Sequence, residues 1–199
     1  MKRIVSTIVL AAAFDALACA GPVLPTIQTL PASGDVAGPP GTAVGWGFTL
    51  SYLGPADWVV LNDSNFTGST VFGSYLDYLT LPTAPFYVVG PAPESASITQ
   101  PWDLSATLGL GEFDINSTVP PGTVIPGDIA VDYSLFSQDP NDPAFDAGSF
   151  VSAGTLDAPV EIMVAPEPGS MLFIGMALLS FVLAIRRRGP LLTKINDQN

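Results

Sequence analysis

The sequence contains no histidine, only one cysteine (Cys19), and no lysine or arginine between residues 4 and 185. Catalysis by imidazole, Schiff-base chemistry on lysine and metal binding by histidine are therefore excluded for this stretch. A single cysteine cannot form a disulfide within the chain, so stability outside the cell must come from a packed core.

Charge is distributed very unevenly along the chain. Fifteen of the 18 acidic residues lie between Gly21 and Ala165, a segment that has no basic residue. The negative field of such a segment repels phosphate backbones, which excludes nucleic acid as a partner and favours divalent cations or cationic surfaces. Dispersed acidic residues also simply keep an extracellular protein soluble.

Three features follow one another near the carboxyl end: the tripeptide Pro166, Glu167, Pro168, the uncharged apolar run Met171 to Ile185, and the cluster Arg186, Arg187, Arg188. A helix over the apolar run is about 22 Å long, short of the roughly 30 Å hydrocarbon core, so it spans a bilayer only marginally. The arginines should stay in the cytoplasm, with everything before Pro166 outside. The two prolines prevent the helix from extending backwards.

This ordered trio resembles the PEP-CTERM sorting signal of Gram-negative bacteria. The resemblance implies recognition by an exosortase, cleavage near Pro166 to Pro168, and delivery to the outer surface or extracellular matrix after transient anchoring in the inner membrane. The polar tail, residues 189–199, is a departure, because such signals usually stop soon after the arginines. The alternative is a permanently inserted single-pass protein.

Residues 1–20 have the features of a secretory signal peptide for the Sec export machinery. Lys2 and Arg3 form a positive n-region, and Ile4 to Phe14 form a short apolar h-region. Small residues then allow cleavage before Cys19 or before Gly21. Cleavage before Cys19 would leave that residue as a lipid acceptor, whereas cleavage before Gly21 would discard it.

Residues 41–165 show the period-two alternation of β-strands. The clearest case is Ala43 to Tyr52, where large apolar residues alternate with small or polar ones. Residues 21–40 contain five prolines and predict an extended arm or an edge strand, and Ser74 to Leu81 fits a strand or a helical turn. Further strands are expected at Trp58 to Leu61, Phe86 to Val89, Trp102 to Leu110, Asp128 to Phe136, Phe150 to Ala153 and Val160 to Val164.

Strands of this number, separated by turn residues, predict an all-β fold: an antiparallel immunoglobulin-like β-sandwich of about seven to eight strands, followed by a single C-terminal hydrophobic helix. Trp46 and Trp102 lie on the apolar faces of their expected strands, so we expect both in the core. A tryptophan outside the core could form a platform on which a sugar stacks, and Trp58, beside Asp57, is the least clearly assigned of the three.

Carboxylates are the only strong acid and base groups in the domain. A pair at the right separation can hydrolyse glycosides, and Glu94, Glu112 and Glu161 are conceivable members. No motif selects two of them, so we expect no enzymatic activity.

One acidic loop contains four oxygen ligands of the kind that calcium prefers: Asp139, Asn141, Asp142 and Asp146. Their spacing is not that of an EF-hand. Pro140 and Pro143 make a rigid turn an equally good explanation.

The sequence thus predicts an exported, non-catalytic cell-surface or extracellular-matrix protein, associated with biofilm or exopolysaccharide. The alternatives are a calcium- or carbohydrate-binding module on the same scaffold and a carboxylate glycosidase. No cofactor other than calcium is expected.

Overall fold

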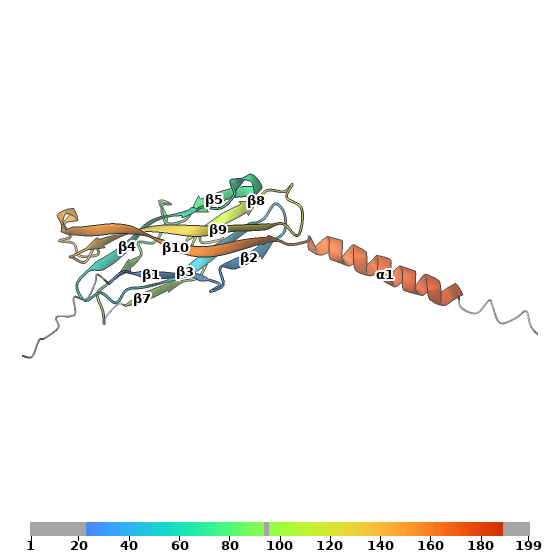
Figure 1. The fold of residues 1–199 in the computed structure, drawn as a ribbon, viewed down its shortest axis with the longest axis horizontal. Helices are drawn as coiled ribbons and strands as arrows, with labels where there is room; N and C mark the ends of the chain where they lie inside the picture. The colour runs from blue at the N-terminus through green and yellow to red at the C-terminus, as the bar shows by residue number, and fades with distance from the viewer. Residues whose placement is uncertain (1–22, 94–95, 189–199) are drawn as a thin grey trace, which may run out of the picture.

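The computed structural model describes residues 23–93 and 96–188, which form two packed β-sheets and one helix, with their connections (Figure 1). The expected signal peptide with Cys19, the residue Glu94 and the polar tail lie outside the described residues. Sheet I consists of β1 (Thr26–Leu30), β3 (Ala43–Ser51), β5 (Gly73–Asp77), β7 (Ser97–Gln100) and β8 (Gly111–Ile115). Sheet II consists of β2 (Asp35–Gly38), β4 (Trp58–Phe66), β6 (Val88–Val89), β9 (Val124–Phe136) and β10 (Phe150–Val164).

This arrangement confirms the predicted all-β sandwich followed by a helix, α1 (Pro168–Arg188). The described residues form ten strands, more than the seven to eight expected. Sheet I has the order β1-β3-β8-β5, with β7 pairing the second half of β3, and sheet II has the order β2-β10-β9-β4-β6. Every pairing is antiparallel except that of β2 with β10.

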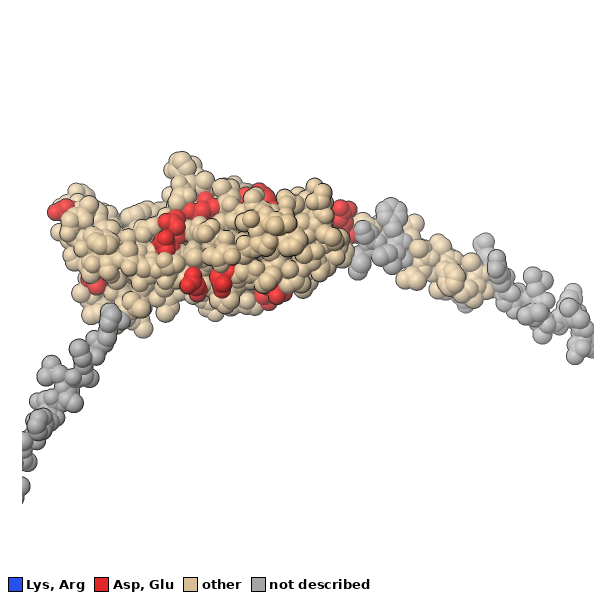
Figure 2. Space-filling view, turned by 45° about the horizontal axis from the view of Figure 1, so that its top comes forward, with Lys and Arg blue, Asp and Glu red and all other residues tan. Residues whose placement is uncertain are grey.

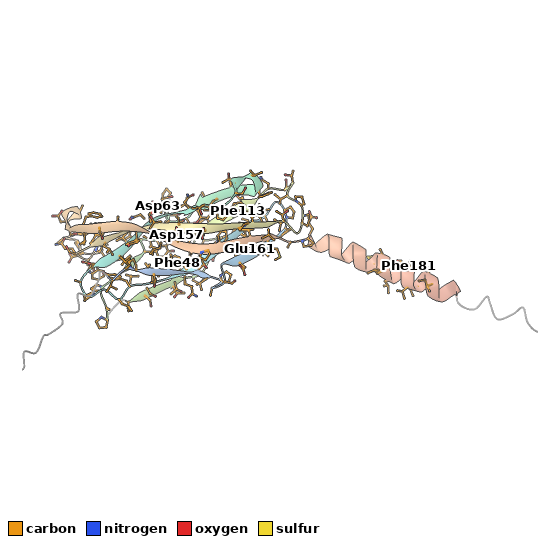
Figure 3. The ribbon with its side chains drawn as sticks, in the orientation of Figure 1. Phe48, Asp63, Phe113, Asp157, Glu161 and Phe181 are labelled. Carbon is orange, nitrogen blue, oxygen red and sulfur yellow. The ribbon has the colours of Figure 1, made fainter. Side chains whose placement is uncertain are left out.

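The core between the sheets follows from the alternation in β3. Val44, Trp46, Phe48 and Leu50 all point into the sandwich, and none is more than 6% exposed. The indole Nε1 of Trp46 donates a hydrogen bond to the carbonyl of Gly34 at 2.7 Å, so the one polar atom of this large side chain is satisfied. Figure 3 labels Phe48 within the sandwich.

The prediction of a strand at Trp102 to Leu110 was wrong. Residues 104–107 form a turn, closed by the carboxylate of Asp103, whose Oδ1 accepts hydrogen bonds from the N–H groups of Ser105 (2.8 Å) and Ala106 (3.1 Å). Thr107 has a φ of 52°, in the left-handed region that a strand does not use. The turn-forming capacity of Asp103 therefore prevailed over the apolar alternation.

Other strands differ from their predictions mainly in length. Phe150 to Ala153 and Val160 to Val164 are the two ends of one continuous strand, β10, and the strand beginning at Trp58 continues to Phe66. The ambiguous segment beginning at Ser74 contributes a strand, β5. Residues 21–40 contribute β1 and β2, each at the edge of its sheet.

The β9–β10 hairpin spans the length of the sandwich. Its register runs from Phe150 opposite Phe136 to Met163 opposite Val124. The connection between the two strands lies at the end of the sandwich opposite α1, so the acidic loop and the helix are at opposite poles (Figure 1).

Candidate functional site

The sorting segment begins where the folded domain ends. The N–H of Val164 donates to the carbonyl of Thr123 at 2.9 Å, and the N–H of Ala165 donates to the carbonyl of Gly38 at 2.9 Å. These two bonds hold the end of β10 against neighbouring segments, so the domain is ordered up to Ala165.

A three-residue linker, Ala165 to Glu167, joins β10 to α1. Pro166 and Glu167 are exposed and belong to no helix or strand. Pro168 is the first residue of the helix, a position that tolerates proline because its missing N–H would be unpaired there anyway. The first two residues of the candidate cleavage tripeptide, Pro166 and Glu167, thus form an accessible tether that ends where the helix begins.

Helix α1 runs away from the sandwich (Figure 1) and exposes apolar side chains. Leu178, Leu179 and Phe181 are 61%, 61% and 65% exposed, and Figure 3 shows Phe181 projecting from the helix. Arg186, Arg187 and Arg188 occupy its final turn.

Within the part of the chain that the structure describes, no helix has the length and apolar character needed to cross a membrane. The expected transmembrane helix is therefore not supported.

The four candidate calcium ligands lie in the loop between β9 and β10, where the carboxylates bind backbone. Oδ1 of Asp139 accepts from the N–H of Asn141 at 2.9 Å, Oδ1 of Asp142 from Ala144 at 2.8 Å, and Oδ1 of Asp146 from Gly148 at 2.8 Å. These are Asx turns, which match the rigid-turn alternative. Among residues 23–93 and 96–188, no three or more Asp, Glu, His or Cys side chains are placed to hold a metal ion, and the calcium assignment stays a prediction.

The candidate glycosidase carboxylates are far from forming a pair. Glu112 lies on β8 between core-facing neighbours, and so on the outer face of sheet I, whereas Glu161 lies on the outer face of sheet II. Glu112 is buried and accepts a 2.5 Å hydrogen bond from the hydroxyl of Tyr78. Burial, together with this bond and the negative charge of Glu112, raises the pKa of the Tyr78 hydroxyl.

Figure 2 shows acidic side chains in separate small groups on one face of the sandwich. Partial burial raises the pKa of Asp63, and the charges of Asp132 and Asp77 raise it further. In contrast, hydrogen bonds from Ser105 and Ala106 lower the pKa of the exposed Asp103.

The sequence did not predict one polar cluster, which is centred on Ser64. The buried hydroxyl of Ser64 on β4 lies 2.6 Å from Oδ1 of Asp77, 2.7 Å from the carbonyl of Leu110 and 2.9 Å from the hydroxyl of Tyr75. Because Asp77 and Tyr75 lie on β5, the cluster ties sheet II to sheet I. Burial raises the pKa of Tyr75. A register shift between Leu61 and Asp63 turns Ser64 inward, and simple alternation does not reveal such a bulge.

The three tryptophans have different environments. Trp46 is in the core, as predicted. The prediction that Trp102 lies in the core was wrong: Trp102 is half-buried on the outer face of sheet I, over Gly45, where an added Cβ would lie 2.2 Å from the indole Nε1. Trp58, at the start of β4, is half-buried and packs against Gly90.

Comparison with known proteins identifies the sorting segment. The family model of the PEP-CTERM protein-sorting motif matches residues 164–188, which confirms the resemblance drawn from Pro166, Glu167, Pro168 and the arginines. No curated protein matches the chain.

Solved structures with a similar fold share little sequence with this chain. WR4, an MSP family member of C. elegans, is 11% identical over 70% of this chain and 98% of its own, with a TM-score of 0.32. AggA, the major subunit of aggregative adherence fimbriae type I of Escherichia coli, is 9% identical over 72% and 95%, with a TM-score of 0.34. CaCohA2 of Clostridium acetobutylicum is 18% identical over 71% and 90%, with a TM-score of 0.32. Similarity at this level supports no inference about function.

The sorting motif, in contrast, indicates where the protein is directed. It marks an exported protein that is directed to the cell envelope or surface and sorted in an exosortase-dependent manner.

Proposed function

We propose that this protein is a non-catalytic component of the cell surface or extracellular matrix, and that an exosortase releases its sandwich by cleavage within Pro166 to Pro168. The observation that carries the proposal is the position of the sorting motif. It begins on the last residue of a strand held by its neighbours and continues through an exposed tether, so cleavage there would leave every strand intact.

Helix α1 would hold the protein at the inner membrane until cleavage. Its exposed apolar side chains need a nonpolar environment, and the arginines that follow favour the cytoplasmic side. A short apolar segment can be accommodated by local thinning of the bilayer and by flanking side chains that extend to the interface. Such a fit is costly, which suits a temporary anchor.

The absence of catalytic activity is inferred from chemistry. The chain has no histidine, and the candidate glutamates Glu112 and Glu161 lie on opposite outer faces. The released acidic sandwich would then act by its surface, in association with an exopolysaccharide layer that is neutral or bridged by cations.

Replacement of the tripeptide tests this proposal. Cells would express the wild-type chain, a variant with Pro166→Ala, Glu167→Ala and Pro168→Ala, and a control variant with Asp139→Asn in the distant loop. Membrane and extracellular fractions would be compared by immunoblot. We expect the wild type and the control in the extracellular fraction and the triple variant in the membrane fraction. Release of the triple variant at the wild-type rate would contradict the proposal.

A further inference from the structure

Strand β10 has a long edge that no described strand covers. On one side β9 pairs with nearly its whole length, but on the other side β2 pairs only with Glu161 to Val164. The stretch Phe150 to Ala158 therefore presents one row of backbone N–H and C=O groups without a strand partner. The other described edge strands are shorter: β1 and β5 have five residues each, β2 and β7 four each, and β6 two. Because β6 pairs only with Val59 and Val60, residues 61–66 of β4 also have no strand partner on that side.

This edge also has few of the features that prevent edge strands from pairing. Proteins usually protect an edge with lysine, proline, inward-pointing charges, a β-bulge or a covering segment. Here Asp157 is the only charged residue in the stretch, Pro159 lies just beyond it, and the one register shift against β9 falls near the end of the stretch, at Val151. Phe150 and Val151 are 52% and 49% exposed. Figure 3 shows Asp157 on the long hairpin, clear of α1.

Both ends of the free stretch are closed. Beyond Ala158, the turn before β2 contacts the strand so closely that an added Cβ on Gly34 would lie 2.3 Å from the carbonyl oxygen of Pro159. Before Phe150, the chain forms the short helix η2 (Ala147–Ser149). A partner strand is therefore limited to the nine positions between these two barriers.

A second copy of β10 fits this limit in one register. In antiparallel pairing about a two-fold axis at Gly154, the midpoint, the nine residues of one copy lie opposite the nine of the other, and the register shift at Val151 interrupts the pairing only near its two ends. Moving the axis toward Ala158 would drive the partner strand against the turn before β2. Moving it toward Phe150 would leave positions unpaired.

The side chains are compatible in the midpoint register. It places Ala158 opposite Phe150, which sets a small residue against a large one, and Asp157 opposite the uncharged Val151. The two copies of Asp157 are six residues apart along the strands, about 20 Å. That distance exceeds the screening length of roughly 8 Å at physiological ionic strength, so their repulsion does not prevent pairing.

We propose that two copies of this protein pair through the free edges of β10, antiparallel and centred on Gly154, to form a dimer with one continuous sheet. Because the contact is isologous, it uses up both long edges and closes at two copies. The acidic composition adds a salt dependence: low ionic strength lengthens the range of repulsion and weakens the dimer.

Analytical ultracentrifugation tests this interface with the exported protein, purified in mild detergent. The informative variant is Ala153→Asp, which brings two carboxylates to about 8 Å from each other across the axis. The matched control is Asn65→Asp, an equal charge change at an exposed position of β4, two strands away in the same sheet. Thermal melts would verify that both variants fold.

We expect a dimer for the wild type and the control, and a dissociation constant raised by about tenfold or more for Ala153→Asp. Hydrogen exchange should slow at alternate amides of residues 150–158 as the wild-type concentration increases. A wild-type monomer whose exchange in this stretch is independent of concentration would overturn the proposal. So would open-ended oligomers, or equal dissociation constants for the two variants.

Discussion

The sandwich and helix α1 contain the same kinds of large apolar residues, but the sandwich buries them and the helix exposes them. Phe48 and Leu50 in β3 are fully buried, whereas Phe181 and Leu179 in α1 are 65% and 61% exposed. In β3 the apolar residues alternate with glycine and threonine, so one face of the strand packs into a core. In α1 they follow one another and surround the helix, so no single neighbour can cover them.

The difference implies that separate segments encode stability and destination. The strands from β1 to β10 supply the core, and the motif at residues 164–188 supplies the sorting signal. Only Ala165 to Glu167 lie between β10 and α1. Substitutions on either side of this linker should therefore affect different properties.

The largest difference in the free energy of unfolding should appear when one phenylalanine on each side of the linker is replaced by alanine. Phe48→Ala should lower the free energy of unfolding by about 3 to 5 kcal/mol, because it removes buried contacts and leaves a cavity. Phe181→Ala should leave it unchanged, since that side chain is exposed. Denaturant unfolding of both variants, in the same detergent, measures the contrast. Equal destabilisation by the two substitutions would mean that α1 packs on the sandwich.

A smaller effect is expected within the sandwich, at the buried pair of Tyr78 and Glu112. Tyr78→Phe removes the 2.5 Å hydrogen bond and leaves Glu112 buried without this donor, which should cost about 1 to 3 kcal/mol. Tyr75→Phe is the matched control, since Ser64 keeps two other partners and the cost should be about 0.5 to 1.5 kcal/mol. Urea unfolding distinguishes the two. A larger loss for Tyr75→Phe would show that the cluster at Ser64 is the more important one.

The smallest effect concerns the stability contributed by surface carboxylates, and its size depends on pH. The pKa of Asp63 is raised in the folded state, so its ionised form lowers stability above that pKa, and the penalty disappears as pH falls through it. Asp63→Asn should raise Tm at neutral pH by about 1 to 3 °C, and the gain should vanish in acid. Asp103→Asn should have the opposite sign at neutral pH, because the pKa of Asp103 is lowered. Thermal melts across pH test both; a gain for Asp63→Asn that persists in acid would refute the electrostatic explanation.

The sequence predicts the structure correctly where one local signal dominates. The alternation in Ala43 to Tyr52 predicted β3 and its core face, and the ordered trio after Ala165 predicted the sorting motif. Both patterns are contiguous, so no knowledge of distant contacts was needed.

The predictions from sequence failed where distant or competing interactions decide the structure. Trp102 to Leu110 has strand-like alternation, but the hydrogen bonds of Asp103 form a turn. Phe150 to Ala153 and Val160 to Val164 were predicted as separate strands, yet pairing with β9 joins them into one strand. The cluster at Ser64 depends on a bulge and on the approach of β5, and neither is visible in a single segment.

The central claim is that the sandwich carries the stability of the protein and a separate, removable segment carries the sorting signal. The most direct test of it is the intact mass of the protein recovered outside the cell. The predicted mass ends within Pro166 to Pro168 and corresponds to a chain that still contains every strand from β1 to β10. A mass that includes α1 and residues Arg186 to Asn199 would contradict release by cleavage at the linker.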